Sequence, residues 1–141
     1  MSAMTCLKAL LWFVCLSHLA MGASLNLVPD AVPILAKYYG AKGEFPAEFV
    51  YIVKPLGAFM MTLGFVGIAA AWNPLKHGSM IYGFAILFLL RSAQRIVYAE
   101  EIEKHLGIAP GRNWMTTAFF LVLAVALVAL YRTAAKASKK L

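Results

Sequence analysis

The chain has 141 residues, enough for one domain, and 62% of them are hydrophobic while only 13% are charged. This composition is too apolar for an ordinary soluble domain and is typical of a protein that crosses the membrane several times. The net charge of +7 does not indicate a nucleic-acid-binding protein, because the basic residues form no basic face and no binding motif. We expect membrane lipids, and no nucleic acid, to be the partner of the basic tail at 132–141.

The first predicted membrane-spanning helix covers residues 6–28. Its start, a basic residue followed by an apolar run, also resembles a secretory signal, but the apolar run continues through Val28 and favours a retained span. At helical spacing, four residues share one stripe of this helix, which we expect to face the other helices: Cys15, His18, Gly22 and Asn26.

His18 is the histidine that falls inside a predicted span. A single axial ligand to haem or chlorophyll is one interpretation, but a bis-histidine haem needs a second histidine at similar depth, and His77 and His105 fall outside the bilayer. Cys15 and His18 together make at most half a metal site. We therefore assign no metal site, and we favour a hydrogen-bonded histidine that packs between helices over an axial ligand to haem or chlorophyll.

The second predicted helix, residues 47–72, follows an interfacial loop at 29–46 that includes a short helix. Pro55 lies in the first third of the second helix and should kink it. The tight turn at 73–77 predicts that the second and third helices are antiparallel neighbours. Small side chains recur along the second helix and should let a neighbouring helix approach closely: Gly57, Gly64, Gly67 and Ala71.

The third predicted span, residues 78–99, begins apolar and then carries two arginines. At about 1.5 Å per residue, Arg91 lies roughly 20 Å from the helix start, still inside a hydrocarbon core about 30 Å thick. Charge in hydrocarbon is costly, so we expect Arg91 to face the bundle or a partner and to have an acceptor: Glu48, the Tyr51 carbonyl, Asn26 or a bound ligand. Four polar side chains share its stripe at helical spacing: Arg91, Gln94, Arg95 and Tyr98.

The helical pattern of the third span continues past the membrane. Neither Gly nor Pro interrupts it between Phe84 and Leu106, and Glu100 and Lys104 form a favourable pair one turn apart. We therefore expect one unbroken helix from Gly78 to Leu106. The fourth predicted span, residues 113–131, has no polar side chain in its middle and completes the bundle.

Four spans place both termini on one side of the membrane. That side, which also holds the turn at 73–77, carries six basic residues: Lys8, Lys76, Arg132, Lys136, Lys139 and Lys140. The loops of the other side carry four: Lys37, Lys42, Lys104 and Arg112. The positive-inside rule therefore predicts that both termini are cytoplasmic. All six acids fall at the outer end: Asp30, Glu44, Glu48, Glu100, Glu101 and Glu103.

The polar residues of the outer half suggest a pocket that opens to the outer side. Its ligand would be an anion or a carbonyl-bearing amphiphile, such as a quinone or a lipid headgroup, because the planar fork of arginine suits carboxylate and phosphate. Two structural interpretations compete: the side chains snorkel to the interface, or they pair with the acids and tie the helices together. The candidate ligand-binding residues are Asn26, Lys54, Arg91, Gln94, Arg95 and Tyr98.

In layout, residues 6–131 resemble the DoxX-like group of small four-helix membrane proteins. The resemblance is carried by four short spans, a long first outer loop and a polar outer end. It implies a four-helix membrane bundle. Some members of the group are linked to quinone-coupled oxidation, which would suit a pocket around Arg91 and Arg95.

We expect one domain, 1–141, that is an all-α bundle of four transmembrane helices. No hydrolase, kinase or thiol-redox motif occurs, so we expect no catalytic activity of its own. The first hypothesis is a non-catalytic subunit of a larger membrane complex, whose partners are other subunits or further copies of the chain. The alternative is a small transporter or quinone-linked redox protein that binds lipid or quinone in the outer pocket.

Overall fold

The computed structural model describes residues 2–42 and 45–139; Gly43, Glu44 and Lys140 lie outside the described residues. The described chain is helical and contains no strand, which confirms the all-α class. Its six helices are α1 (Ala3–Leu27), α2 (Ala31–Tyr38), α3 (Ala47–Trp72), α4 (Gly78–Val97), α5 (Ala99–Leu106) and α6 (Pro110–Ser138). Four of them, α1, α3, α4 and α6, are long and apolar enough to cross a membrane.

The boundaries of the long helices follow local sequence signals. Ser2 caps α1, because its hydroxyl accepts a hydrogen bond from the amide of Thr5 at 3.2 Å. α3 begins at the predicted residue and continues through Pro55 to Trp72. α6 is longer than the predicted span at both ends, with Pro110 in its first turn, where the missing amide proton is not needed.

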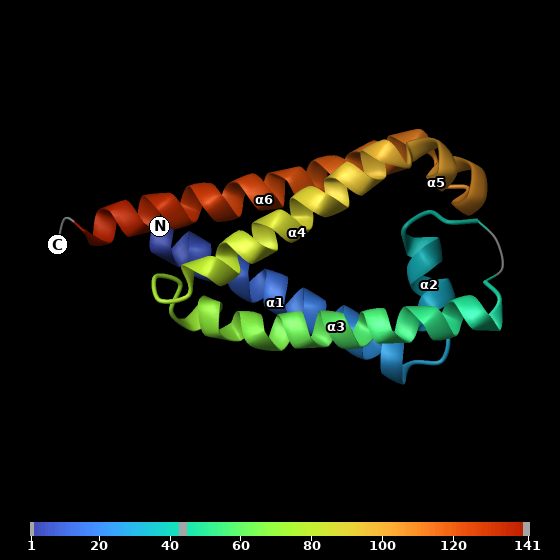
Figure 1. Ribbon diagram of the computed structural model, residues 1–141, viewed down its shortest axis with the longest axis horizontal. Helices are drawn as coiled ribbons and strands as arrows, with labels where there is room; N and C mark the ends of the chain where they lie inside the picture. The colour runs from blue at the N-terminus through green and yellow to red at the C-terminus, as the bar shows by residue number, and fades with distance from the viewer. Residues whose placement is uncertain (1, 43–44, 140–141) are drawn as a thin grey trace.

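The long helices pack as two antiparallel pairs, α1 with α3 and α4 with α6 (Figure 1). Contacts between the pairs come mainly from α1 against α6. α3 runs antiparallel to α4, as the turn at 73–77 predicts, but the two helices make few contacts and diverge from each other (Figure 1). The short helix α2 connects α1 to α3, and the short helix α5 connects α4 to α6.

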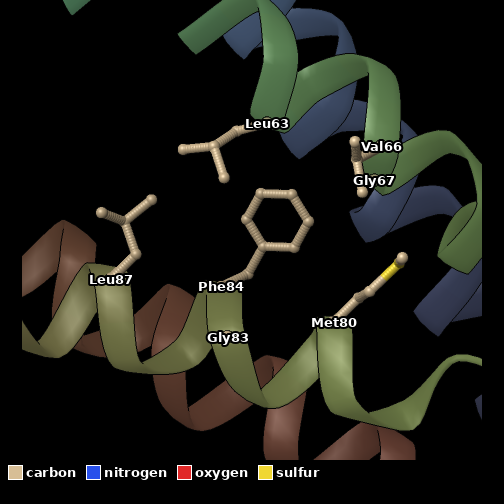
Figure 2. Close-up of a pocket in the computed structure, with 7 residues that line it drawn as sticks. All are labelled: Leu63, Val66, Gly67, Met80, Gly83, Phe84 and Leu87. Carbon is tan, nitrogen blue, oxygen red and sulfur yellow. The ribbon is translucent and has the colours of Figure 1, made fainter. Parts of the chain in front are cut away.

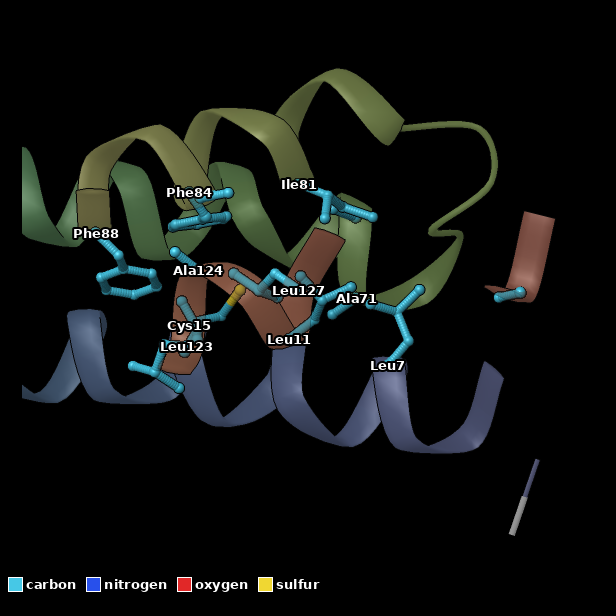
Figure 3. Packing of buried hydrophobic residues seen from close by; sticks show 14 residues of the cluster. Leu7, Leu11, Cys15, Ala71, Ile81, Phe84, Phe88, Leu123, Ala124 and Leu127 are labelled. Atoms are coloured by element: carbon cyan, nitrogen blue, oxygen red, sulfur yellow. The ribbon is translucent and has the colours of Figure 1, made fainter. Parts of the chain in front are cut away.

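The hydrophobic core lies at one end of the bundle, which we call the termini end because it holds the start of α1, the end of α6 and the turn at 73–77 (Figures 1 and 3). Every long helix contributes: the N-terminal half of α1, the last turns of α3, the first turns of α4 and the second half of α6. The largest fully buried apolar side chains there are Leu7, Leu11, Val14, Ile81 and Leu127. The pairs are therefore held together at the termini end and separate towards the opposite end.

At the opposite end, the segment around α2 docks on the connection between α5 and α6. The amide of Lys42 donates to the carbonyl of Leu106 at 2.8 Å. Arg112 Nη2 donates to the carbonyl of Tyr38 at 2.6 Å, and the Arg112 guanidinium lies 5.8 Å from the centre of the Tyr38 ring. Gly40, with φ of 90°, permits the turn that brings this segment into place.

The prediction of one unbroken helix from Gly78 to Leu106 is wrong. α4 ends at Val97, Tyr98 takes a non-helical conformation with φ of −103° and ψ of 29°, and α5 begins at Ala99. The physical reason is a contact from α6: the side-chain amide of Asn113 donates to the carbonyl of Arg95 at 2.9 Å. In an unbroken helix, the Arg95 carbonyl would instead accept a hydrogen bond from the amide of Ala99.

Candidate functional site

The polar stripe of α4 divides into residues that contact α6 and residues that do not. Arg95 is half-buried and bonds to Asn113, whereas Gln94 and Tyr98 are exposed. Arg91 is also exposed, and its guanidinium carbon lies 5.6 Å from the centre of the Phe120 ring on α6. The stripe therefore presents two arginines, one helical turn apart, beside an aromatic ring.

Arg95 is fixed in place by Asn113. Its Nη1 donates to Asn113 Oδ1 at 2.7 Å, while Asn113 Nδ2 donates back to the Arg95 carbonyl. Asn113 is only 3% exposed, and sequence reasoning treated it merely as the start of the fourth span. The available signal was the spacing of Asn113 and Thr117, which places two polar side chains on one face at the start of the helix.

A buried polar seam continues from this contact along α4 and α6. The hydroxyl of Ser92 reaches the carbonyls of Phe88, at 2.9 Å, and Thr117, at 3.3 Å. The Thr117 hydroxyl donates to the carbonyl of Asn113 at 2.9 Å. Ser92, Asn113 and Thr117 thus bind the two helices to each other and leave Arg91 outside the seam.

None of the three predicted protein acceptors bonds to Arg91 in the described chain. Among the described residues it makes no hydrogen bond or ion pair, and neither Glu48 nor Asn26 nor the Tyr51 carbonyl contacts it in this way. The guanidinium lies against the Phe120 face as a cation–π contact, and the fourth predicted acceptor, a bound ligand, stays a prediction. Its N–H donors remain available.

No carboxylate of the described chain neutralises the arginine pair. Asp30, Glu48, Glu100, Glu101 and Glu103 are all exposed, and the described residues form no ion pair. Arg91 and Arg95 therefore lie one helical turn apart without a carboxylate of the described chain to neutralise them.

Two of the six candidate residues do not join the arginines. Asn26 Nδ2 donates to the carbonyl of Gly22 at 3.0 Å and lies against Gly57. Lys54 is exposed on α3 and makes no hydrogen bond with the described residues. Among the six candidate residues, Arg91 and Arg95 are the charged side chains that share one stripe of α4.

The small residues predicted for helix packing lie where α1 and α3 meet. A Cβ atom on Gly22 would come within 2.5 Å of the Gly57 carbonyl oxygen, and one on Gly64 within 2.8 Å of the Cys15 carbonyl oxygen. A Cβ atom on Gly67 would come within 2.7 Å of both Cys15 Sγ and Phe84 Cζ. Ala71 is fully buried in the core. The small-residue ridge of α3 is therefore occupied by α1.

His18 lies between α1 and α4. Its Nδ1 bonds to the carbonyl of Val14 at 2.8 Å, and its ring centre lies 5.7 Å from that of Phe84 and 6.1 Å from that of Phe88. The described chain contains no group of three or more His, Cys, Asp or Glu side chains that could hold a metal ion. These contacts are those of a packing histidine.

An apolar groove, which sequence reasoning missed, runs between α3 and α4 (Figure 2). Its volume is about 210 Å³. The wall from α4 consists of Met80, Gly83, Phe84 and Leu87, and the wall from α3 consists of Leu63, Val66 and Gly67. The groove exists because α3 and α4 diverge and because Gly83 has no side chain to fill the space beside it.

Comparison with protein families, curated proteins and solved structures finds no match to this chain. The resemblance to DoxX-like proteins therefore stays a prediction, and function has to be argued from the geometry of the residues.

Proposed function

We propose that this chain is a non-catalytic membrane protein that binds an anionic amphiphile through Arg91, supported by Arg95. The observation that carries the proposal is the state of Arg91. It lies in a membrane-spanning helix, next to a second arginine, with neither a carboxylate nor a hydrogen-bond acceptor from the described residues. Intramembrane ionisable residues most often mark a functional site.

A bound anion would lower the energetic cost of placing Arg91 and Arg95 in the membrane. An arginine at the centre of a span costs about 2.5–3.5 kcal/mol on the insertion scale, and like charges one turn apart repel. Arg91 lies about 9 Å along the helix axis before the end of α4 at Val97, so it is displaced from the centre but still within the helix. A bound anion would offset the repulsion between Arg91 and Arg95. It would also accept hydrogen bonds from the free N–H groups of the Arg91 guanidinium.

The arginine pair favours an anionic lipid over a quinone. A quinone carbonyl is a neutral acceptor and would leave the repulsion between Arg91 and Arg95 in place. A carboxylate or phosphate matches the planar donor fork of Arg91 and carries the opposite charge. Arg95, which Asn113 holds through one guanidinium nitrogen, contributes its charge.

Replacement of Arg91 by leucine tests the proposal. The purified chain and the Arg91→Leu variant would be extracted in mild detergent, and their bound lipids measured by mass spectrometry per folded molecule. We expect the anionic lipid content to fall in Arg91→Leu while the protein still accumulates. Lys104→Leu is the control, because Lys104 is an exposed basic residue on α5, away from both the arginine pair and the basic tail. Unchanged lipid content in Arg91→Leu would contradict binding at Arg91.

The second candidate function is a non-catalytic subunit of a larger membrane complex, and Lys54 favours it. Lys54 is exposed on a membrane-spanning helix and has no acid partner among the described residues, so a carboxylate of a neighbouring chain could pair with it. Crosslinking in intact membranes tests this idea. Loss of a crosslinked partner in Lys54→Met, at unchanged lipid content, would support the subunit over the lipid-binding protein.

A further inference from the structure

The apolar groove between α3 and α4 leads towards Arg91. Met80, Gly83 or Phe84, Leu87 and Arg91 follow one another at intervals of three or four residues on α4, so they lie on one face of the helix. Arg91 stands four residues beyond Leu87, about 6 Å along the helix axis. The apolar groove and Arg91 therefore follow one another along the same face of α4.

We propose that this groove holds the hydrocarbon chain of an anionic lipid whose headgroup is bound by Arg91. The inference rests on the proposed function and adds the place and chemistry of the ligand's tail. The headgroup would lie beside Arg91 and Phe120, and the chain would run from Leu87 towards Met80, in the direction of the termini end. The ligand class is thus a long-chain carboxylate or phosphate amphiphile.

The dimensions of the groove favour a single hydrocarbon chain. An apolar cavity of about 150 Å³ accepts a benzene molecule, so the groove, at about 210 Å³, accepts a short hydrocarbon segment. A helix of a partner protein is about 10 Å across and does not fit this space. The walls carry no polar side chain, so the groove offers nothing to a polar ligand.

Variants that fill the groove from either wall test its occupancy. Gly83→Leu adds a side chain where a Cβ atom meets nothing within 4 Å, so the variant should fold. Val66→Phe fills the groove from α3, where Val66 is 44% exposed, and serves if Gly83→Leu is unstable. Ala93→Leu is the matched control, because Ala93 is exposed on the face of α4 opposite Arg91. Thermal unfolding would establish that each variant is folded.

The probes are myristate, octanoate and methyl myristate, and binding to the full chain would be measured by native mass spectrometry from detergent. We expect the wild type to prefer myristate over both octanoate and the uncharged ester. Gly83→Leu and Val66→Phe should bind myristate about tenfold more weakly, equivalent to the loss of roughly two buried methylene groups, and octanoate unchanged. Ala93→Leu should behave as the wild type.

Two outcomes distinguish an error about chain binding in the groove from an error about anion binding at Arg91. If the wild type prefers myristate over its methyl ester, but both groove variants bind myristate as the wild type does, the groove is not the site of the chain and this inference is wrong. If the wild type does not distinguish myristate from its methyl ester, the proposed anion binding is wrong. The inference about the groove, which rests on it, is then wrong as well.

Discussion

Asn113 and Arg95 bind each other through two hydrogen bonds that run in opposite directions. The guanidinium of Arg95 donates to the Asn113 side-chain oxygen, and the Asn113 side-chain nitrogen donates to the Arg95 carbonyl. One asparagine on α6 thus holds a charged side chain of α4 and also takes the backbone acceptor that would have extended α4 past Val97.

Replacement of Asn113 by alanine should destabilise the protein. The change leaves the Arg95 guanidinium without its described acceptor in a half-buried place, so we expect a loss of about 1–3 kcal/mol in the free energy of unfolding. Denaturant titration in detergent would measure it. Thr116→Ala is the control, since the Thr116 hydroxyl bonds only to the Arg112 carbonyl in its own helix. Equal stability of the two variants would contradict this role for Asn113.

A methyl group at Gly22 should separate α1 from α3. The nearest atoms to the new Cβ include the Gly57 carbonyl oxygen, at 2.5 Å, and the Met61 amide nitrogen, at 2.8 Å, and backbone atoms cannot move aside as a side chain can. We expect Gly22→Ala to cost about 1–3 kcal/mol and to lower the thermal midpoint. Gly83→Ala has open space and should leave the midpoint unchanged or raise it. A Gly22→Ala midpoint at or above that of the wild type would refute the close approach.

Arg112→Ala should release the segment around α2 from the α5–α6 connection. The variant loses the hydrogen bond to the Tyr38 carbonyl and the contact with the Tyr38 ring. We expect the amides of Gly40 and Lys42 to exchange hydrogen roughly tenfold faster, because local opening becomes easier. Lys104→Ala, an exposed change on α5, is the control. Equal exchange rates in both variants would show that Arg112 does not hold this segment.

The orientation in the membrane can be tested by cysteine labelling in a background without Cys6 and Cys15. Ser138, the last residue of α6, and Lys42, whose amide bonds to Leu106 at the opposite end, are both exposed. If both termini are cytoplasmic, an impermeant maleimide added to intact cells should label Lys42→Cys and not Ser138→Cys, and permeabilisation should make both react. The reverse pattern in intact cells would overturn the orientation derived from the basic residues.

The long helices were predictable because each is a run of apolar residues with a signal at its start or end. The place of the helix break was not predictable in the same way. It depends on Asn113, which is 18 residues away from Arg95 in sequence and acts only once α4 and α6 lie together. Helix propensity describes neighbours along the chain, and it carries no information about such a contact.

The candidate site was predictable only in part. Helical spacing placed Arg91 and Arg95 on one stripe, but their surroundings depend on how far α3 stands from α4. A tight turn at 73–77 fixes the direction of the two helices and not the angle between them. The groove and the separation of Lys54 and Asn26 from the arginines follow from that angle, and hence from tertiary packing.

The close contact between α1 and α3 has a consequence for biogenesis. Both helices precede α4 and α6 along the chain, so this antiparallel pair can close in the membrane before the second pair is complete. The polar seam of Ser92, Asn113 and Thr117 lies wholly within the second half and can join α4 to α6 without help from the first. The chain can thus be inserted as two preassembled halves, which meet last through the apolar core of the termini end.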